Sequence, residues 1–330
     1  MIKYSDNEKK LKGYTFIDLF CGIGGFHLAL SSLGAECVFA SDINEKACSV
    51  YEKNFKLRPF GDITKIKCKN IPAHDILCAG FPCQPFSISG RKKGFDDKNG
   101  KLFFEIIRIA RYHKPKVIFL ENVRNLEAHN DGKTLDTIKL KLKQIGYKTF
   151  VKVLNASNFG TPQARKRIYI VAIRNNLKIN EFDFPENYGE LKCLEEILLL
   201  DVPNECWITR DYKVNHEIEE VKTNKLLRIG SIGLGRQGER IYSIKGQSAT
   251  LSSQGGGPGG KTGIYLIDDK IRILSPRECA RLMGFPDCFL LAETSFDCYT
   301  QFGNSVVVNV IQEIAKAISI KLEDAENGKH

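Results

Sequence analysis

Residues 16–26, FIDLFCGIGGF, decide how the chain begins to fold. A run of apolar and aromatic residues enters a GxGG turn, and a helical pattern follows directly. Glycines at such a turn let the N-terminus of a helix, with its free N–H groups, approach a ligand closely. The stretch therefore predicts a strand, a turn and a helix with a ligand at the turn; the alternative is a plain tight turn.

The same alternation of short β-like runs and helical patterns continues through the first half of the chain. The expected strands are 15–20, 37–41, 75–79, 117–121, 150–155 and 167–173, and the expected helices are 25–33, 45–54, 101–113 and 134–145. Near-continuous apolar strands separated by helices are typical of a parallel sheet covered on both faces. The predicted fold class is therefore α/β, with a Rossmann-like sheet whose ligands bind beyond the carboxyl ends of the strands.

The second half of the chain differs in composition. Residues 228–263 hold 11 of the 28 glycines, five basic residues and one acid, without a clean helical or strand period. This predicts a smaller domain of short strands and loops whose glycines let a partner come close. Helical patterns return at 275–285, where Ser275, Pro276 and Glu278 form a capping box, and at 306–322. We expect a main domain of residues 1–190 and 302–330, a second domain of 191–274, and a connecting segment of 275–301.

Charge and cysteine content narrow the class of protein. Lys and Arg number 49 against 39 acidic residues, a net charge of +10, which suits a polyanionic partner such as nucleic acid or serves solubility alone. The 11 cysteines include no CxxC pair, so we expect no zinc site of the common spacing. The chain has no apolar run near the roughly 18 residues that a membrane helix needs, and we expect a soluble, cytoplasmic protein.

Two acidic residues follow the glycine turn. Asp42 lies at the end of the second expected strand, 18 residues beyond Gly24, where an acid typically binds a ribose diol. Asp62 is expected to end a third strand in the same layer and to meet an adenine amine. Two carboxylates without a basic cluster suit a nucleoside that carries no phosphates, such as S-adenosyl-L-methionine; a dinucleotide cofactor is the alternative.

A second group of reactive residues follows the next strands. In AGFPCQPFSISG, residues 79–90, Cys83 stands between Pro82 and Pro85, which stiffen the loop. Rigidity suits a nucleophile, although a single cysteine is more often a packed thiol. Glu121 ends another strand at the same edge, and the alternate spacing of Arg165 and Arg167 places both on one face. These charges predict either a substrate site or an ordinary ion pair.

Six segments in order resemble the motif series of the DNA (cytosine-5) methyltransferases. They are FIDLFCGIGG, GFPCQPFS, ENV, QARKRIYIVA, RILSPRECARLMGFPD and QFGNSVVVNV, and together they span nearly the whole chain. The resemblance implies S-adenosyl-L-methionine as methyl donor, double-stranded DNA as substrate, and no metal, membrane or obligate protein partner. It further implies a monomer that acts in the cytoplasm of a prokaryotic or phage-infected cell.

The resemblance also assigns roles to residues. Cys83 would be the nucleophile, Glu121 would bind N3 and the exocyclic amine of cytosine, Arg167 would lie near O2, and Arg165 would support the site and a nearby phosphate. The implied cofactor residues are Phe20, Gly22, Gly24, Gly25, Asp42, Ile43, Asp62, Ile63, Pro82, Asn304 and Ser305. The loop 87–101 would be a lid with Ser89 on the DNA backbone; otherwise it is a solvated surface loop.

Sequence specificity is expected in the second domain. QGERIYS and the glycine-rich loop that follows resemble family members that modify GCGC, with Gln237 filling the space of the extruded base and Arg240 binding a guanine edge. Gln254 departs from this subgroup, which has an aromatic residue there. The expected activity is the modification half of a restriction–modification pair. An RNA-directed enzyme of the same fold, a catalytically silent DNA-binding relative and a nicotinamide oxidoreductase are the alternatives.

Overall fold

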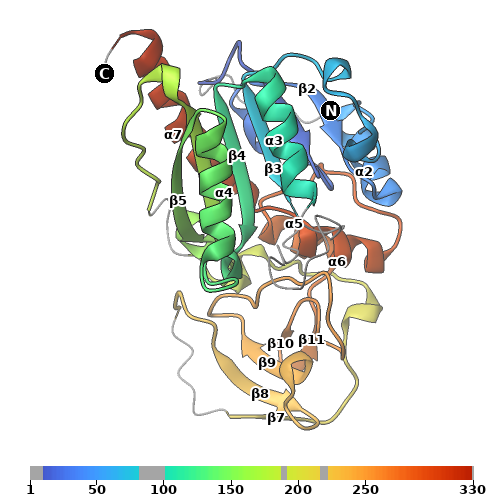
Figure 1. The fold of residues 1–330 in the computed structure, drawn as a ribbon. Helices are drawn as coiled ribbons and strands as arrows, with labels where there is room; N and C mark the ends of the chain where they lie inside the picture. The colour runs from blue at the N-terminus through green and yellow to red at the C-terminus, as the bar shows by residue number, and fades with distance from the viewer. Residues whose placement is uncertain (1–9, 82–100, 187–191, 216–221, 329–330) are drawn as a thin grey trace, which may run out of the picture.

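The computed structural model describes residues 10–81, 101–186, 192–215 and 222–328. Its main sheet has six strands in the order β2-β1-β3-β4-β6-β5. These strands are β1 (Thr15–Leu19), β2 (Glu36–Ser41), β3 (Ile76–Gly80), β4 (Val117–Val123), β5 (Tyr147–Asn155) and β6 (Lys166–Arg174). All six correspond to expected strands, with ends shifted by up to three residues. Figure 1 shows this sheet with its helices above a smaller sheet formed by the later part of the chain.

The prediction of a wholly parallel sheet is wrong at one strand. β1, β2, β3 and β4 pair in parallel, whereas β6 is antiparallel to both β4 and β5. Residues 156–165, which join β5 to β6, contain one 3-10 turn and are fewer than the dozen or so that a parallel crossover requires. The chain therefore reverses, and β6 enters the sheet at the edge where the parallel strands end.

Helices cover both faces of the main sheet, as expected for the α/β class. α1 (Gly25–Ser32) and α7 (Val308–Glu326) share a core with one set of strand residues, and α3 (Lys101–His113) and α4 (Lys133–Gln144) share a core with the alternate set. Along β1, for example, Phe16 packs into the first core and Ile17 into the second. α2 (Glu45–Phe55) begins at Asn44, whose side chain accepts the Ala47 N–H.

The second sheet is small and has its own apolar core. Its order is β11-β10-β9-β8-β7, formed by β7 (Tyr212–Val214), β8 (Arg228–Ile232), β9 (Arg240–Ser243), β10 (Ile264–Ile267) and β11 (Lys270–Arg272). Five buried isoleucines from these strands make up the core: 229, 232, 241, 264 and 271. Gly230 is required here, because a Cβ at this position would lie 2.2 Å from the Lys213 carbonyl oxygen on β7. This sheet is the predicted smaller, mostly β unit.

Two helices connect the small sheet back to α7. α5 (Pro276–Leu282) has the predicted capping box at Ser275 and Glu278, and α6 (Ser295–Asn304), which the sequence pattern did not reveal, follows it. Glu278 is fully buried and binds the Arg272 guanidinium through two hydrogen bonds of 2.7 and 2.8 Å. This ion pair fixes the end of β11 to the start of α5.

Short 3-10 helices complete the described structure. They are η2 (Ile63–Lys65), η3 (Cys68–Asn70), η4 (Arg124–Leu126), η5 (Ala156–Phe159), η6 (Asn175–Leu177), η7 (Leu194–Ile197), η8 (Asn204–Cys206) and η9 (Gln237–Glu239). Within the described ranges, no helix is long and apolar enough to cross a membrane.

Candidate active site

A cavity of about 810 Å³ opens at the carboxyl edge of the parallel strands. Residues that follow or end β1, β2, β3 and β4 line it, together with the start of β6 and the end of α6. The predicted site residues in its lining are Phe20, Gly22, Gly25, Asp42, Ile43, Asp62, Ile63, Glu121, Arg165, Arg167, Asn304 and Ser305. The structure therefore brings the two predicted groups, the cofactor end and the chemistry end, into one cavity.

The glycine turn supports one wall of the cavity. Gly22 has a φ of +53° and Gly24 a φ of +88°, in the left-handed region that glycine adopts most readily. A Cβ on Gly24 would lie 2.3 Å from the Phe55 ring, and a Cβ on Gly25 would lie 2.6 Å from Val306. Gly24 is not among the described lining residues, and its lack of a side chain lets the start of α1 pack closely against α2.

Asp42 is held in place by the glycine turn. Its two carboxylate oxygens accept N–H groups from Gly22 and Asn44, each at 2.8 Å. Each oxygen keeps a further lone pair that is free to accept a hydroxyl hydrogen from a ligand. Asp42 is therefore oriented before any ligand binds.

The position predicted for Asp62 requires a correction. It does not end a strand; it caps the 3-10 helix η2, and its carboxylate accepts hydrogen bonds from the Thr64 hydroxyl and N–H at 2.7 and 3.0 Å. These bonds lower the pKa of Asp62 below its usual range, so it is ionised at neutral pH. In the part of the chain that the structure describes, an isolated bridge between Ser41 and Phe60 is what extends the sheet towards this residue.

Two apolar side chains complete the cofactor end. Ile43 is 75% exposed although it lines the cavity, and Phe20 has a left-handed backbone with a φ of +55°, which is uncommon for a residue other than glycine. Such backbone strain is concentrated at functional sites, where surrounding structure holds it in place. Together with Ile63, these residues offer flat apolar contacts next to the carboxylates of Asp42 and Asp62.

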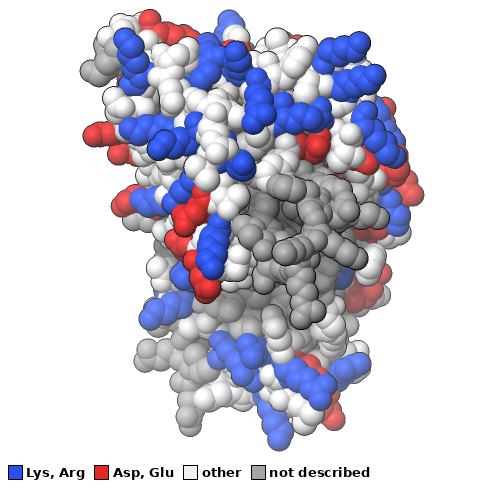
Figure 2. All heavy atoms as spheres, in the orientation of Figure 1, with Lys and Arg blue, Asp and Glu red and all other residues white. Residues whose placement is uncertain are grey.

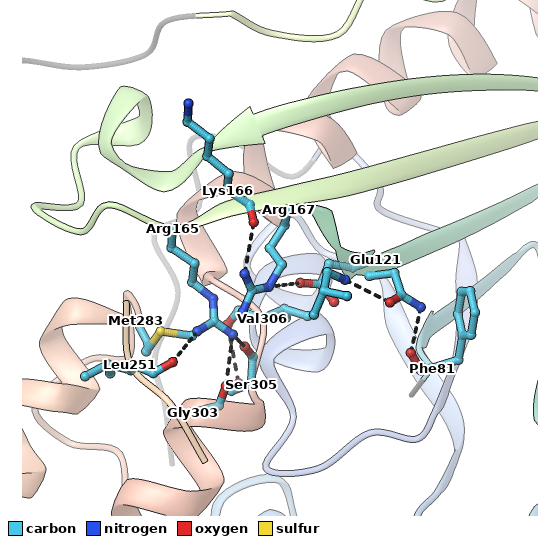
Figure 3. Close-up of polar contacts among 12 residues, drawn as sticks. Phe81, Glu121, Arg165, Lys166, Arg167, Leu251, Met283, Gly303, Ser305 and Val306 are labelled. Carbon is cyan, nitrogen blue, oxygen red and sulfur yellow. Dashed lines mark hydrogen bonds and ion pairs between the residues drawn. The ribbon is translucent and has the colours of Figure 1, made fainter. Parts of the chain in front are cut away.

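Glu121 and Arg165, both buried, and Arg167, half-buried, form a charged group at the chemistry end (Figure 3). Arg167 Nε lies 3.3 Å from Glu121 Oε1, and Arg167 also donates to the Lys166 carbonyl. Arg165, which is 2% exposed, donates to the carbonyl oxygens of Leu251, Gly303 and Ser305 at 2.8–3.0 Å. These three bonds favour the predicted supporting role of Arg165 over the predicted contact with a phosphate.

Burial sets the protonation of this group. It raises the pKa of Glu121 above its usual range, and the charges of Arg167 and Arg165 offset only part of that effect. Burial lowers the pKa of Arg165 to about 9, with a further contribution from Arg167, so Arg165 stays charged at neutral pH. The arrangement can hold a proton on Glu121 or give it up, within reach of fixed positive charge.

The predicted nucleophile loop lies outside the described residues. It contains Pro82, Cys83 and Ser89. The residue before it, Phe81, is described, and its carbonyl oxygen accepts a hydrogen bond of 2.9 Å from the Asn122 side chain. Asn122 is buried, lines the cavity and was not singled out from the sequence; the available signal was a polar amide next to Glu121 at a strand end.

The predicted recognition residues lie on the small sheet. Gln237, which is exposed, starts the turn η9, and Arg240, half-buried, begins β9. This turn packs against the glycine-rich loop: the Gly238 carbonyl accepts the Gly259 N–H at 2.9 Å, and a Cβ on Gly238 would lie 2.3 Å from the Gly256 oxygen. Ser253 and Gln254, just before that loop, line the cavity. The turn predicted to read DNA packs against the segment that continues from the cavity-lining residues Ser253 and Gln254.

Comparisons with known proteins support the resemblance to the DNA (cytosine-5) methyltransferases that the sequence motifs showed. The model of the C-5 cytosine-specific DNA methylase family matches residues 14–320. The type II methyltransferase M.HhaI of Haemophilus parahaemolyticus is 50% identical over 319 residues, which cover 96% of this chain and 97% of that protein. The type II methyltransferase M.HpaII of Haemophilus parainfluenzae is 40% identical over an alignment of 340 residues, which covers 96% of this chain and 92% of that protein.

A solved structure shows the same fold. The S. pombe Dnmt2 methyltransferase superposes with a TM-score of 0.72 at 24% identity, over 94% of this chain and 98% of that one. The family model spans the glycine turn, the charged group and the small sheet alike. The chain belongs to the C-5 cytosine-specific DNA methylase family and is a DNA (cytosine-5) methyltransferase.

Proposed function

We propose that this enzyme transfers a methyl group from S-adenosyl-L-methionine to C5 of a cytosine extruded from a short duplex DNA site of the GCGC type. The observation that carries the proposal is the single cavity that holds the Glu121–Arg167 pair at one end and Asp42 and Asp62 at the other. Relatives that carry type II methyltransferase names support a role as the modification enzyme of a restriction–modification system.

The cofactor end fits a nucleoside that carries no phosphates. Asp42, oriented by two backbone N–H groups, would accept the ribose hydroxyls, and Asp62 would accept from an adenine amine. Phe20 and Ile43 would contact the faces of the base, and Asn304 and Ser305 would meet the amino-acid portion. When bound, S-adenosyl-L-methionine supplies a methyl group on a sulfonium sulfur.

Cytosine C5 is a poor nucleophile, and the protein residues would change that. The Cys83 thiolate adds to C6, Glu121 favours protonation at N3, and Arg167 stabilises negative charge that develops at O2. C5 of the resulting enamine would take the methyl group, leaving S-adenosyl-L-homocysteine. Transfer of the C5 proton to a base such as water, with departure of the Cys83 thiolate from C6, would restore the aromatic ring. Arg165 holds the end of α6 and the 251 carbonyl in place around this pair.

A base inside a duplex is out of reach of these residues, so the target cytosine must leave the helix at a cost of a few kcal/mol. Gln237 would occupy the vacated space and Arg240 would bind a guanine edge. Figure 2 shows Lys and Arg spread over the face of the main domain that carries α3 and α4 and again over the small sheet below it, with Asp and Glu between them. Such charge supports attraction of a polyanion to a monomeric, cytoplasmic enzyme.

We further propose the division of the chain that follows from this assignment. Residues 1–190 and 302–330 would bind the cofactor and perform the chemistry, residues 191–274 would read the DNA, and residues 275–301 would connect the two. The cavity supports this division, because residues of the first unit line it together with Ser253 and Gln254 of the second.

Bisulfite sequencing of plasmid DNA from cells that express the protein tests the function. Methylation of one cytosine in every GCGC site is expected, and the Cys83→Ala variant should leave these sites unmethylated while still binding the same DNA. Methylation in another context would correct the recognition site alone. Absence of methylated cytosine with the wild type, or methyl transfer to transfer RNA in its place, would overturn the proposal.

A duplex that carries 5-fluorocytosine at the target tests the covalent step. The fluorine cannot leave as a proton does, so the Cys83 adduct should accumulate when cofactor is present. A protein–DNA species that survives denaturing electrophoresis is the expected result, and its absence would contradict a thiol mechanism.

A further inference from the structure

One fully buried amide side chain joins three separate parts of the molecule. Gln163, 0% exposed, lies just before β6. Its Oε1 accepts the Leu251 N–H at 3.2 Å, and its Nε2 donates to the Leu282 carbonyl at 3.2 Å and contacts Met283 Sδ at 3.4 Å. A buried polar side chain with all its groups in use is costly to remove, because each lost bond leaves another buried group unpaired.

The backbone around Gln163 strengthens the same connection. Residues 162–165 run beside residues 248–251: the Ser248 N–H donates to the Pro162 carbonyl at 2.8 Å, and the Ala164 N–H donates to the Ser248 carbonyl at 3.1 Å. The Thr250 hydroxyl donates to the Ala164 carbonyl. We call these two paired segments, 162–165 and 248–251, the junction.

Along the chain, the junction connects the charged group of the active site with the turn η9 that is proposed to read DNA. On one side the chain continues from Gln163 to Arg165 and Arg167. On the other side it continues from Leu251 to the cavity-lining Ser253 and Gln254, and then into the glycine-rich loop that packs on η9. The end of α6 packs closely against this segment, because a Cβ on Gly303 would lie 2.2 Å from the Ser253 nitrogen.

We propose that Gln163 is a positioning residue that sets the register of the recognition segment against the active-site strand. If the Leu251 N–H slips from Gln163, the Leu251 carbonyl also moves from Arg165, which supports the same junction at 3.0 Å. Site discrimination and turnover would therefore depend on a side chain that is outside the described lining of the cavity. This inference rests on the proposed function, since it assumes that the small sheet reads DNA.

The test compares Gln163→Met with a matched control. Methionine has a similar length and removes all three contacts. Asn54 is the control, because its buried amide also makes three hydrogen bonds, none of them to the junction. It donates to the Val50 and Leu290 carbonyls and accepts the Leu290 N–H. Asn54→Leu should lower the melting temperature by a similar amount.

Turnover should separate the two variants. For Gln163→Met we expect kcat on the preferred site to fall about tenfold and the preference over sites with one changed base to narrow about tenfold, each equivalent to about 1.4 kcal/mol. The KM for S-adenosyl-L-methionine should stay within twofold of wild type. Asn54→Leu should keep both kcat and site preference. Equal losses in the two variants, or wild-type values for Gln163→Met, would overturn the proposal.

Hydrogen exchange provides a readout that needs neither cofactor nor DNA. Amides 248–251 should exchange faster in Gln163→Met than in wild type, and at the wild-type rate in Asn54→Leu. Unchanged exchange in Gln163→Met would overturn the proposal even if turnover fell. If the wild type methylated no DNA, the proposed function would fail, and hydrogen exchange would still decide whether Gln163 holds the junction.

Discussion

Arg167 contacts Glu121 because β6 is antiparallel to β4. In the register of the two strands, Arg167 lies opposite Val123 and Glu121 lies opposite Tyr169, so both charged side chains are on one face, 3.3 Å apart. A parallel β6 would have carried its first residues to the opposite edge of the sheet, away from the cavity. The one reversed strand is therefore what places a cation beside this carboxylate.

The Glu121–Arg167 pair should act as a unit in methyl transfer. We expect Glu121→Gln and Arg167→Ala each to lower the single-turnover rate by about 10²- to 10³-fold, the size typical of removing one preorganised charge or donor. Because each residue positions the other, the double variant should lose much less than the product of the single losses. Rapid-quench measurement of methyl transfer checks this, and multiplicative losses would show that the two residues act independently.

Asp42 should govern cofactor affinity. Asp42→Ala removes the acceptor for the ribose and leaves the Gly22 and Asn44 N–H groups without their partner. We expect the Kd for S-adenosyl-L-homocysteine to rise about tenfold to a hundredfold, equivalent to about 1.4–2.8 kcal/mol, as titration calorimetry would record. Asp183→Ala, at an exposed carboxylate, is the control and should bind as wild type does. Equal affinity in both variants would remove Asp42 from the cofactor site.

Periodicity in the sequence predicted most of the fold. The strands and helices of residues 15–174 have apolar patterns that depend only on neighbouring residues. The structure confirms those expected within a few residues, except the strand expected to end at Asp62. The direction of β6 depends instead on the short connection after β5, and it was missed. α6 was missed as well, because its first turn carries Ser295, Phe296 and Asp297 without a clear apolar stripe.

The site could be predicted where its residues lie near the carboxyl ends of strands, as Asp42 after β2 and Glu121 near the end of β4 do. The contacts of Asn122 and Gln163 could not be predicted in this way, because their partners are the carbonyl groups of Phe81 and Leu282, distant in sequence. Every residue type carries a backbone carbonyl, so the sequence does not reveal which carbonyl will accept a hydrogen bond. Such contacts emerge only when the chain is folded.

Gly24 should be more sensitive to substitution than Gly22. Both have positive φ, so an alanine at either position costs about 1–2 kcal/mol of folding free energy. At Gly24 the added Cβ would also lie 2.3 Å from the Phe55 ring, whereas at Gly22 it meets nothing within 4 Å. Chemical denaturation should therefore show a larger loss for Gly24→Ala. In a Phe55→Leu background this extra loss should shrink, and an unchanged loss would mean that the contact with Phe55 is not its cause.

The buried carboxyl of Asp18 should give stability an unusual dependence on pH. Burial raises the pKa of Asp18 well above its usual value, and the His27 backbone amide offsets this only in part. A raised pKa in the folded state favours folding below the unfolded pKa, near 4, and this contribution is lost as the pH rises. The amide that replaces this carboxyl in the Asp18→Asn variant cannot ionise. The melting temperature of this variant should therefore rise relative to that of wild type as the pH increases from about 4 to 7.

Asp297 should show the opposite dependence of stability on pH, because its pKa is lowered where that of Asp18 is raised. Hydrogen bonds from Lys46 and Thr294 lower its pKa, so its contribution to stability is present above the unfolded pKa and is lost as the pH falls through the folded one. Asp297→Asn should therefore melt below wild type at pH 7, and the gap should close on acidification. Differential scanning fluorimetry across this range checks both variants. Parallel curves for wild type and Asp18→Asn would show that the Asp18 pKa is the same in the folded and unfolded states.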